Sequence, residues 1–248
     1  KKDATVALDM ISLFPHDTYK GHGLRKDLAE AIAELKPKFV RFPGGCMSHG
    51  QGIDNIYHWN HTIGPWQDRK PDKNIWNYHQ TRGLGFYEYF QMCEDMGAEP
   101  LPVLAAGVPC QNSRANAEGY GGQQGGIPMS EMSAYCQEIL DMIEWANGDP
   151  ATSKWAKMRA DAGHPAPFDL KYVGVGNEDL ISTDFEDRYL LICKAIKAKY
   201  PNIIVCGTVG PFHDPSSDYI EGWKFAKQHS DVIEMVDEHY YESTGWFM

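Results

Sequence analysis

The chain has 248 residues, of which 42% are hydrophobic and 23% charged, as expected for a soluble globular protein with a sizeable core. Lys and Arg number 23 against 34 Asp and Glu, a formal net charge of −11, and no basic patch stands out. This balance argues against nucleic acid and anionic membranes as partners. No run approaches eighteen apolar residues, so no transmembrane helix is expected.

The first half of the chain predicts two helices, each followed by a strand. Apolar residues with helical spacing share one face of the segment 24–35: Leu24, Leu28, Ile32 and Leu35. The following segment 39–45, FVRFPGG, is a short strand that runs into a turn. A second helix over about 85–96 ends at Gly97, and it leads into an apolar strand over 100–107.

The second half predicts three more strands, over 171–178, 202–208 and 232–241. Helices separate them. The first begins at a capping box formed by Thr183 and Glu186 and runs through Tyr200. The second lies around 219–228.

Strands that alternate with helices predict parallel βαβ units. Because the strands are apolar runs rather than clean alternations, both of their faces should be covered. A TIM barrel and a doubly wound sheet both fit this pattern. The glycine-rich segment 120–128, YGGQQGGIP, lacks the spacing of a dinucleotide-binding turn, so nucleotide binding is not expected.

Two long segments, 46–84 and 107–129, follow predicted strand ends and are rich in Trp, His and Gly. In a barrel, loops after strands build the active face, so these loops are interpreted as substrate walls. An inert, decorated surface is the alternative. The irregular stretch 147–170 precedes a strand and should therefore lie on the opposite face.

Polar residues cluster where the strands end: Arg41, Asn177, Glu178, and the run Asp237, Glu238, His239, Tyr240 and Tyr241. In a barrel these strand ends converge. A carboxylic acid there can protonate a leaving oxygen while a second carboxylate about 5–5.5 Å away attacks the anomeric carbon, and a nearby amide can bond the sugar 2-hydroxyl. Arg41 could hold a carboxylate ionised. From the residues alone, a surface or structural ion pair explains Glu178 equally well.

Other chemistries have weaker support. The six cysteines form no CxxC pair, and reduced core thiols are favoured over disulfides. His58 and His61 lie three apart, with His49 and His79 nearby, but no HExxH spacing supports a metal site. The absence of a G-x-S-x-G string argues against a serine hydrolase.

Six strings, spread in order over almost the whole chain, resemble glycoside hydrolase family 51, the α-L-arabinofuranosidases: DMISLFP, GLRKDLAEAIAELKPKFVRFPGGC, TIGPWQDR, GLGFYEYFQMCEDMGAEP, FDLKYVGVGNED and VDEHYY. The resemblance implies a (β/α)8 TIM barrel without a metal or organic cofactor. It also implies retaining hydrolysis that releases terminal arabinofuranosyl residues from arabinan- or arabinoxylan-type polysaccharides. Family members are often oligomers, so a second copy of the chain is a further candidate partner.

The resemblance also implies roles for particular residues. Glu178 matches the general acid/base. The matched substrate-binding positions are Arg41, Cys46, Trp76, Asn177, His239 and Tyr240. Which of Glu238, His239 and Tyr240 points inward is open, because period-two alternation pairs Glu238 with Tyr240, or His239 with Tyr241. Burial and a neighbouring carboxylate should raise the pKa of Glu178.

The family pattern extends beyond this sequence. Residues 1–14 match the last strand of an inserted β-sandwich domain, and 15–248 match barrel strands two to six only. The nucleophilic Glu is expected downstream, in the rest of the same polypeptide, and Glu238 or Glu242 is not favoured as its replacement. A five-strand arc should leave two unpaired edges and an open core. A non-catalytic sugar-binding fragment, or another retaining barrel glycosidase such as a β-xylosidase, remains the alternative.

Overall fold

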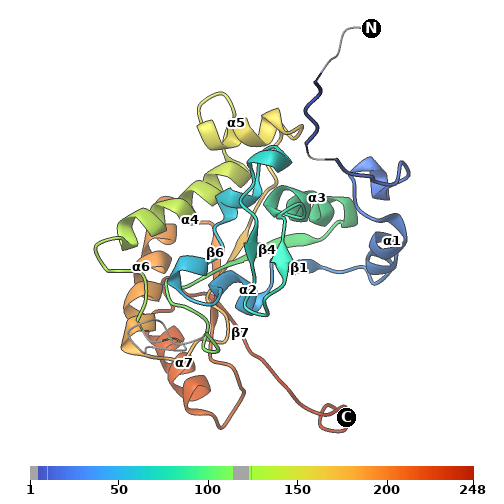
Figure 1. The fold of residues 1–248 in the computed structure, drawn as a ribbon. Helices are drawn as coiled ribbons and strands as arrows, with labels where there is room; N and C mark the ends of the chain where they lie inside the picture. Colours follow the sequence, from blue (N-terminus) through green and yellow to red (C-terminus); the bar gives the residue numbers. More distant parts are fainter. Residues whose placement is uncertain (1–4, 10, 114–122, 124) are drawn as a thin grey trace, which may run out of the picture.

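The computed structural model describes residues 5–9, 11–113, 123 and 125–248. Five parallel strands form its centre in the order β1-β4-β5-β6-β7 (Figure 1). Their bounds are β1 (Phe39–Phe42), β4 (Glu99–Leu104), β5 (Tyr172–Val175), β6 (Ile204–Thr208) and β7 (Met235–Asp237). Each strand pairs with its neighbour in register, as in Val173 opposite Val205. The result is an α/β fold whose sheet curls into a half-barrel, so the doubly wound alternative is not adopted.

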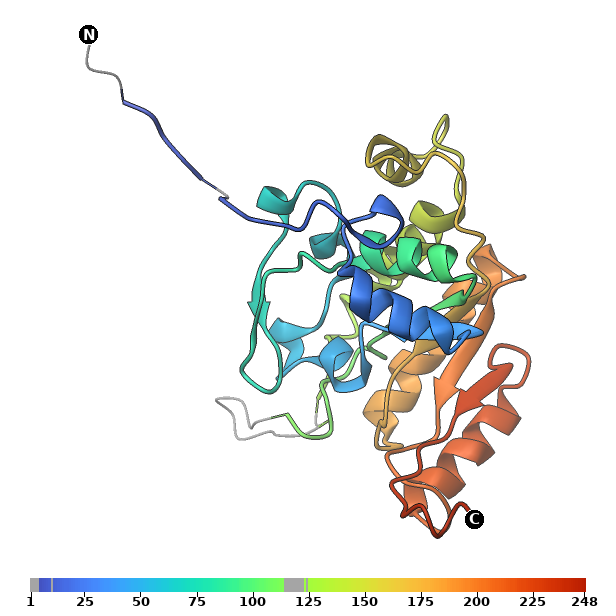
Figure 2. The ribbon, with the colours of Figure 1, turned by 90° about the vertical axis from the view of Figure 1, so that its right-hand side faces the viewer.

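Helices connect the strands and cover the outer face of the sheet (Figure 2). Their bounds are α1 (Lys26–Glu34), α2 (Gly45–His49), α3 (Phe86–Met96), α4 (Met132–Asn147), α5 (Lys154–Asp161), α6 (Thr183–Lys199) and α7 (Ser217–Gln228). A small hairpin of β2 (Asp72–Lys73) and β3 (His79–Gln80) lies in the long segment after β1. Short 3-10 turns occupy Tyr19–Gly21, Ile53–Asn55, Trp59–Thr62 and Trp66–Asp68.

Several predicted boundaries are confirmed, and two are corrected. Helix α3 ends where expected, since Gly97 adopts the left-handed conformation with φ 67°. The cap of α6 is Ser182, whose hydroxyl accepts the Phe185 N–H; the predicted capping box, which began at Thr183, is therefore one residue late. Strand β7 has only three residues instead of ten, because the chain leaves the β6 ladder after Asp237.

The stretch 147–170, predicted to be irregular, contains helix α5 and a buried arginine. The guanidinium of Arg159 is fully buried and donates to five backbone carbonyl oxygens, those of Trp145, Ala146, Gly148, His164 and Pro165. Charge-assisted hydrogen bonds of this kind stabilise a loop that has little apolar content of its own. Helix α5 lies at the opposite end of the sheet from α2 (Figure 1).

The two faces of the sheet differ. Phe42, Val173 and Val205 point into a buried core shared with the helices. The opposite face borders a hollow of about 580 Å³ lined by Phe39, Arg41, Leu101, Tyr172, Cys206 and Met235, among others. Among the described residues no further strand pairs with β1 or β7, which is the open arc that the sequence predicted.

Helix α1 carries Leu28 and Ile32 of the predicted apolar stripe, Leu24 and Leu35 lie just outside its bounds, and all but the half-buried Leu24 are exposed. Leu28 is 54% exposed and Leu35 is 80% exposed, while Ala29 is the buried residue of this helix. The helical periodicity was therefore predicted correctly, and the burial that such a stripe usually indicates is not found here.

The N-terminal segment leads away from the body of the molecule (Figure 2). Residues 5–9 and 11–14 are exposed and form no strand, while residues 1–4 and 10 lie outside the described part. Much of the glycine-rich segment 120–128 also lies outside it. The division into a sandwich strand and a barrel stays a prediction. Within the described ranges, no helix combines the length and apolarity needed to cross a membrane.

Candidate active site

Side chains from three strand ends meet at the carboxyl edge of the sheet. Arg41, on β1, donates from Nη2 to Oδ1 of Asn177 at 2.6 Å; Asn177 lies just after the end of β5. The same nitrogen forms an ion pair with Asp237 Oδ2, at the end of β7, at 3.0 Å. The convergence expected from a barrel-like arrangement is therefore present, and Arg41 links residues that lie far apart in the sequence.

In the turn after β5, the backbone of Glu178 has an uncommon conformation. Gly176 has φ 81° and Glu178 has φ 51°, the left-handed region that side chains rarely adopt. Asp179 Oδ2 accepts the Asn177 N–H at 2.8 Å, which fixes the turn. A Cβ at Gly176 would lie 2.3 Å from that carboxylate oxygen, so the position requires glycine.

A buried ion pair lies beneath this turn. His49 Nε2 on α2 is 3.2 Å from Asp179 Oδ1, and both side chains are 0% exposed. Burial lowers the pKa of His49, but the charge and hydrogen bond of Asp179 outweigh burial, so the net pKa is raised. The pair holds α2 against the turn. Gly45 on α2 permits the approach, since a Cβ there would lie 2.2 Å from Asn177 Oδ1.

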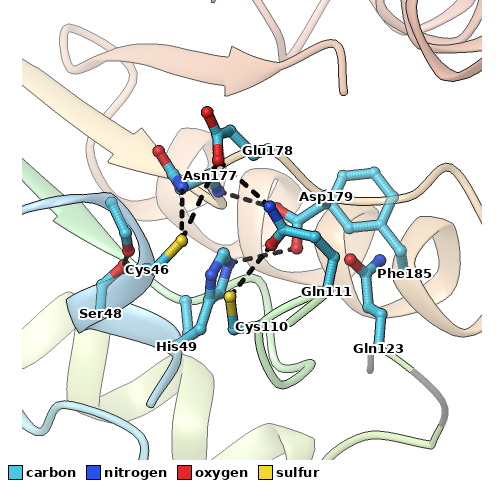
Figure 3. A network of polar contacts seen from close by, with 12 residues as sticks. Cys46, Ser48, His49, Cys110, Gln111, Gln123, Asn177, Glu178, Asp179 and Phe185 are labelled. Atoms are coloured by element: carbon cyan, nitrogen blue, oxygen red, sulfur yellow. Dashed lines mark hydrogen bonds and ion pairs between the residues drawn. The ribbon is translucent and has the colours of Figure 1, made fainter. Parts of the chain in front are cut away.

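Cys46 extends from α2 toward the same residues (Figure 3). Its Sγ is 3.9 Å from Asn177 Nδ2 and 4.0 Å from Glu178 Oε2. A hydrogen bond with Cys110 lowers the pKa of Cys46 to about 7, although burial acts in the opposite direction. The predicted pocket position is thus adjacent to the carboxylate. All six cysteines are free, in line with the expectation of reduced thiols.

The Glu178 carboxylate accepts hydrogen bonds from three other segments. His239 Nδ1 lies 2.6 Å from Oε1, Tyr241 donates its hydroxyl to the same oxygen, and Gln111 Nε2 donates to Oε2 at 3.1 Å. Burial acts to raise the pKa of Glu178, but the hydrogen bonds from His239 and Tyr241 outweigh it and lower the pKa. The predicted upward shift is therefore wrong for this structure, because donors rather than a second carboxylate surround Glu178.

His239 bridges two carboxylates. Its Nδ1 contacts Glu178, and its Nε2 lies 3.5 Å from Asp237 Oδ2. Hydrogen bonds with Asp237 and Glu178 raise the pKa of His239 to about 9. The imidazole is therefore cationic at neutral pH and forms a charged link between the ends of β5 and β7.

The question of which side chains point inward after β7 is resolved. His239 and Tyr241 face Glu178, in agreement with one of the two alternating pairs. Glu238 turns the other way and accepts from Tyr219 Oη at 2.9 Å and from the Tyr240 hydroxyl. The structure thus brings His239 to the site but not Tyr240. Tyr241 takes that place, and the alternation was the signal that could have identified it.

Trp76 lies farther out, in the turn between β2 and β3, where it is 56% exposed. Two contacts connect this hairpin to the segment that carries Cys46. Gln51 Nε2 donates to Asn77 Oδ1 at 3.2 Å, and Gln80 Nε2 donates to the Met47 sulfur at 3.0 Å. The hairpin therefore belongs to the wall formed by the segment 46–84, and its contacts with that segment are made by Asn77 and Gln80 rather than by Trp76.

The remaining candidates have partners of their own. His58 Nδ1 lies 2.9 Å from Glu138, and His61 Nε2 lies 3.0 Å from Lys70 Nζ. Within the described residues, no three His, Cys, Asp or Glu side chains are grouped as metal ligands would be. Glu242 pairs with His213 at 2.9 Å. Neither Glu242 nor Glu238 is presented toward Glu178 by these contacts.

Comparison with known sequences relates the arrangement to a family. Residues 31–248 match the family model described as alpha-L-arabinofuranosidase 1 domain. The chain is 45% identical, over 98% of its length, to an extracellular exo-alpha-L-arabinofuranosidase of Streptomyces chartreusis, and it covers 29% of that protein. It is 38% identical over 89% of its length to alpha-L-arabinofuranosidase 1 of Arabidopsis thaliana, covering 31%. The chain thus spans about a third of the length of these relatives.

Comparison with solved structures leads to the same family. An arabinose-bound α-L-arabinofuranosidase named MgGH51 superposes with a TM-score of 0.74 at 35% identity, over 93% of this chain and 33% of that one. The arabinofuranosidase of Thermotoga maritima, solved with arabinose, gives a TM-score of 0.65 over 92% of this chain and 41% of that one. At 24% identity the second likeness supports the fold alone.

Proposed function

Because the chain belongs to glycoside hydrolase family 51, the α-L-arabinofuranosidases, we propose that the protein is a glycosidase acting on arabinofuranosides. It releases terminal α-L-arabinofuranosyl residues from arabinan- or arabinoxylan-type polysaccharides. Hydrolysis proceeds with retention, through a proton donor on one side of the glycosidic bond and a nucleophilic carboxylate on the other.

Glu178 is the general acid/base in this proposal. One observation carries the assignment: its carboxylate stands at the carboxyl end of β5 beside Asn177, whose side-chain oxygen is fixed by Arg41 from β1 at 2.6 Å. Asn177 Nδ2 donates one hydrogen to Cys46 Sγ at 3.9 Å, and its second hydrogen can donate to a sugar hydroxyl. Such positioned contacts orient the anomeric carbon toward the acid.

The lowered pKa of Glu178 means that the carboxylate is ionised in the free site. To donate a proton it must first accept one, and the cationic His239, bonded to it at 2.6 Å, opposes this by favouring the carboxylate. Bringing a second carboxylate close would favour the protonated form of Glu178. We propose that binding of sugar together with the nucleophile produces this change.

The nucleophile is proposed to lie outside these 248 residues. It would belong to the part of the full-length protein that corresponds to the unmatched two thirds of the relatives. In the same proposal, β1, β4, β5, β6 and β7 correspond to strands two to six of a (β/α)8 barrel, and residues 1–14 belong to the preceding β-sandwich. The open edges of β1 and β7 and the uncovered hollow between them support this division, since a closed barrel would pair both edges.

Leaving-group dependence tests the role of Glu178. In the full-length protein, Glu178→Ala should reduce kcat/KM about 10²–10⁴-fold for an aryl arabinofuranoside with a poor leaving group, and far less for one with a good leaving group. The matched control is Glu186→Ala, a carboxylate on α6 outside the site. Equal losses with both leaving groups would contradict the assignment of Glu178.

A sugar-binding protein without catalysis is the second candidate, because among the described residues no second carboxylate is presented directly to Glu178. Binding and turnover assays on the full-length protein distinguish the two candidates. Arabinose binding without turnover by the full-length protein favours the second candidate. Turnover of an aryl arabinofuranoside, with none of an aryl xyloside, favours the arabinofuranosidase over a β-xylosidase.

A further inference from the structure

The segment that follows β4 brings a glutamine to the Glu178 carboxylate. Residues 108–110 are buried, and the Cys110 carbonyl accepts the Ser113 N–H at 2.9 Å, so the chain turns soon after the strand end. Gln111 lies in this turn. Strands β4 and β5 are parallel neighbours inside the sheet, so this turn and the turn that carries Glu178 meet at the carboxyl edge, away from the open edges of β1 and β7.

The two oxygens of the Glu178 carboxylate have different partners. Oε1 accepts from His239 Nδ1 at 2.6 Å and from the Tyr241 hydroxyl. Oε2 accepts from Gln111 Nε2 at 3.1 Å, and the Cys46 thiol is 4.0 Å away. A proton on Oε1 would displace one of two donors, of which His239 is cationic. A proton that Glu178 takes up is therefore better accommodated on Oε2, the oxygen that faces Gln111.

Both ends of the Gln111 amide are engaged (Figure 3). Its Nε2 donates to Glu178 Oε2 at 3.1 Å, and its Oε1 accepts from Cys110 Sγ, also at 3.1 Å. Cys110 is 0% exposed and Glu178 is 6% exposed, so water does not readily replace either partner. A hydrogen bond with Cys46, together with burial, raises the pKa of Cys110, which therefore keeps its proton. Carboxylate, amide and thiol form a continuous row.

The same row also suits the protonated form of Glu178. The two ends of an amide are nearly equal in size, but one accepts and the other donates, and a thiol can do both. After a half-turn of the amide about its Cγ–Cδ bond, Gln111 Oε1 accepts from a Glu178 O–H, and Nε2 donates to Cys110 Sγ. The number of hydrogen bonds in the row is unchanged, and every hydrogen on Nε2 and Sγ stays on its atom.

The partners on Oε1 favour the ionised form instead. Burial acts to raise the pKa of Glu178, but the hydrogen bonds from His239 and Tyr241 outweigh it. A retaining glycosidase needs its acid/base in both forms during every cycle, first as acid and then as base. A contact that serves both forms is therefore required, and the Gln111 amide on Oε2 has the chemistry to provide it.

We propose that Gln111, backed by Cys110, is a positioning residue that holds the transferred proton on Glu178 Oε2 and reverses its amide as this proton leaves and returns. The proposal rests on the function proposed above. When Glu178 acts as acid, the proton moves from Oε2 to the leaving glycosidic oxygen, and Gln111 turns to donate to the carboxylate. When Glu178 acts as base, a proton of the attacking water moves to Oε2, and the amide turns back.

The test separates the two half-reactions in the full-length protein. Gln111→Leu removes both ends of the amide at similar side-chain size. With a poor leaving group, for which proton donation limits the rate, kcat/KM should fall about 3–10-fold. With a good leaving group that gives a burst of aryl product, kcat reports hydrolysis of the glycosyl-enzyme and should fall by a similar factor, whereas kcat/KM changes little. The alkaline limb of the pH profile should stay in place, because both forms of Glu178 lose one hydrogen bond.

Variants at Cys110 test the inner end of the row. Cys110→Ala leaves the amide without this partner, and both half-reactions should slow about two- to threefold. Cys110→Ser should lose less, because a hydroxyl also donates and accepts. The matched control is Gln137→Leu: the exposed Gln137 donates from Nε2 to Asp141 Oδ1 at 2.8 Å on α4, and its removal should leave both half-reactions unchanged.

Three results overturn the proposal. A loss in Gln111→Leu that is confined to one half-reaction would show that the amide serves only one form of Glu178; if it only donates, the alkaline limb moves to higher pH. Equal losses of kcat/KM for both leaving groups would indicate a general structural role. Unchanged rates would show that Gln111 positions nothing.

If the wild type hydrolyses no arabinofuranoside, the proposed function fails on its own, and infrared difference spectroscopy then decides about Gln111. The spectrum of Glu178→Gln identifies the band of the protonated Glu178 carboxyl group. In Gln111→Leu, a shifted band with an unchanged pKa of Glu178 supports the proposal. A changed pKa, or a band that does not shift, overturns it.

Discussion

The two sides of the candidate site are built differently. On the β5 side, the turn that carries Asn177 and Glu178 rests on the buried pair of His49 and Asp179, whose side chains are 0% exposed. On the β7 side, the strand has only three residues, and Tyr241 beyond it is 67% exposed. The first side is fixed by a buried ion pair and close packing, and the second by hydrogen bonds to Glu178 itself.

This difference separates two tasks. The buried pair and close packing position the carboxylate and the amide independently of the charge on Glu178, as a preorganised site requires. Hydrogen bonds from His239 and Tyr241 depend on the charge of Glu178, so the β7 side responds when that charge changes. In the function proposed above, the rigid side would hold the sugar while the charge-dependent side adjusts the proton donor.

Removing the buried Asp179 carboxylate beneath the turn should have the largest effect, a loss of stability. Asp179→Ala leaves His49 without its partner and frees the Asn177 N–H. Because breaking a buried ion pair leaves an uncompensated polar group, the free energy of unfolding should fall by about 3–5 kcal/mol. Urea unfolding of the full-length protein measures it.

The control for Asp179 is Asp161→Ala, whose pair with Lys157 is exposed and should contribute about 0.5 kcal/mol or less. Similar losses in the two variants would show that the His49–Asp179 pair has no special role. The double variant His49→Met/Asp179→Leu should recover part of the loss, because it removes both buried charges together.

A single methyl group tests the rigidity of the β5 side. In Gly45→Ala, the new Cβ would lie 2.2 Å from Asn177 Oδ1, so the amide must move and the hydrogen bond from Arg41 is disturbed. Turnover of an aryl arabinofuranoside should fall roughly 10–100-fold, as expected for displacement of a positioning group. Helix propensity alone would favour alanine at this position, so it cannot cause a loss.

Gly52→Ala is the matched control for Gly45→Ala. It lies in the same segment, its φ of 174° is ordinary extended backbone, and no atom lies within 4 Å of the added Cβ. Equal activities of the two variants would argue against a close fit between α2 and Asn177.

The smallest expected effect is on the pH dependence of stability, through His239 on the β7 side. The pKa of His239 is raised to about 9, above the ordinary histidine value of about 6.5. Its contribution to stability is therefore complete below about pH 6.5 and is lost as the pH rises through about 9. The Tm of the wild type should decline by a few degrees over this interval, and the decline should be shallower in His239→Gln.

Two other histidines share the same direction, since the pKa values of His49 and His213 are also raised. The difference between wild type and His239→Gln is therefore the informative quantity. Parallel declines would mean that His239 does not form a charged link in solution. At acid pH the sign reverses for Glu178: its lowered pKa stabilises the fold above the ordinary carboxyl pKa, and that contribution disappears as the pH falls.

Local sequence signals correctly predicted the end of α3 and the buried strands. Gly97 ends α3 in the left-handed conformation, which glycine adopts without strain. The apolar runs of β4, β5 and β6 are buried as their composition indicates. Helix α5 was missed because its two buried residues are Ala156 and an arginine, Arg159, which is satisfied by backbone carbonyls outside the helix. No periodicity reveals such a partner.

The site was predictable only in part. Arg41, Asn177 and Glu178 were expected from their places at strand ends and from the family strings, and the contact between Arg41 and Asn177 agrees with that grouping. The role of His49 depends on a contact across 130 positions of sequence, which spacing does not indicate. The direction of the Glu178 pKa was predicted wrongly because the outcome depends on which of His239, Tyr240 and Tyr241 turns inward.

The left-handed backbone at Glu178, φ 51°, has a consequence for how the protein responds to selection. Such a conformation costs on the order of 1 kcal/mol for a residue with a side chain and little for glycine. Glycine at 178 would relieve this cost, but it would also remove the acceptor that His239, Tyr241 and Gln111 share, so the two effects on stability oppose each other. In laboratory evolution for thermostability, the residue that emerges at 178 should show whether backbone relaxation or this set of hydrogen bonds contributes more.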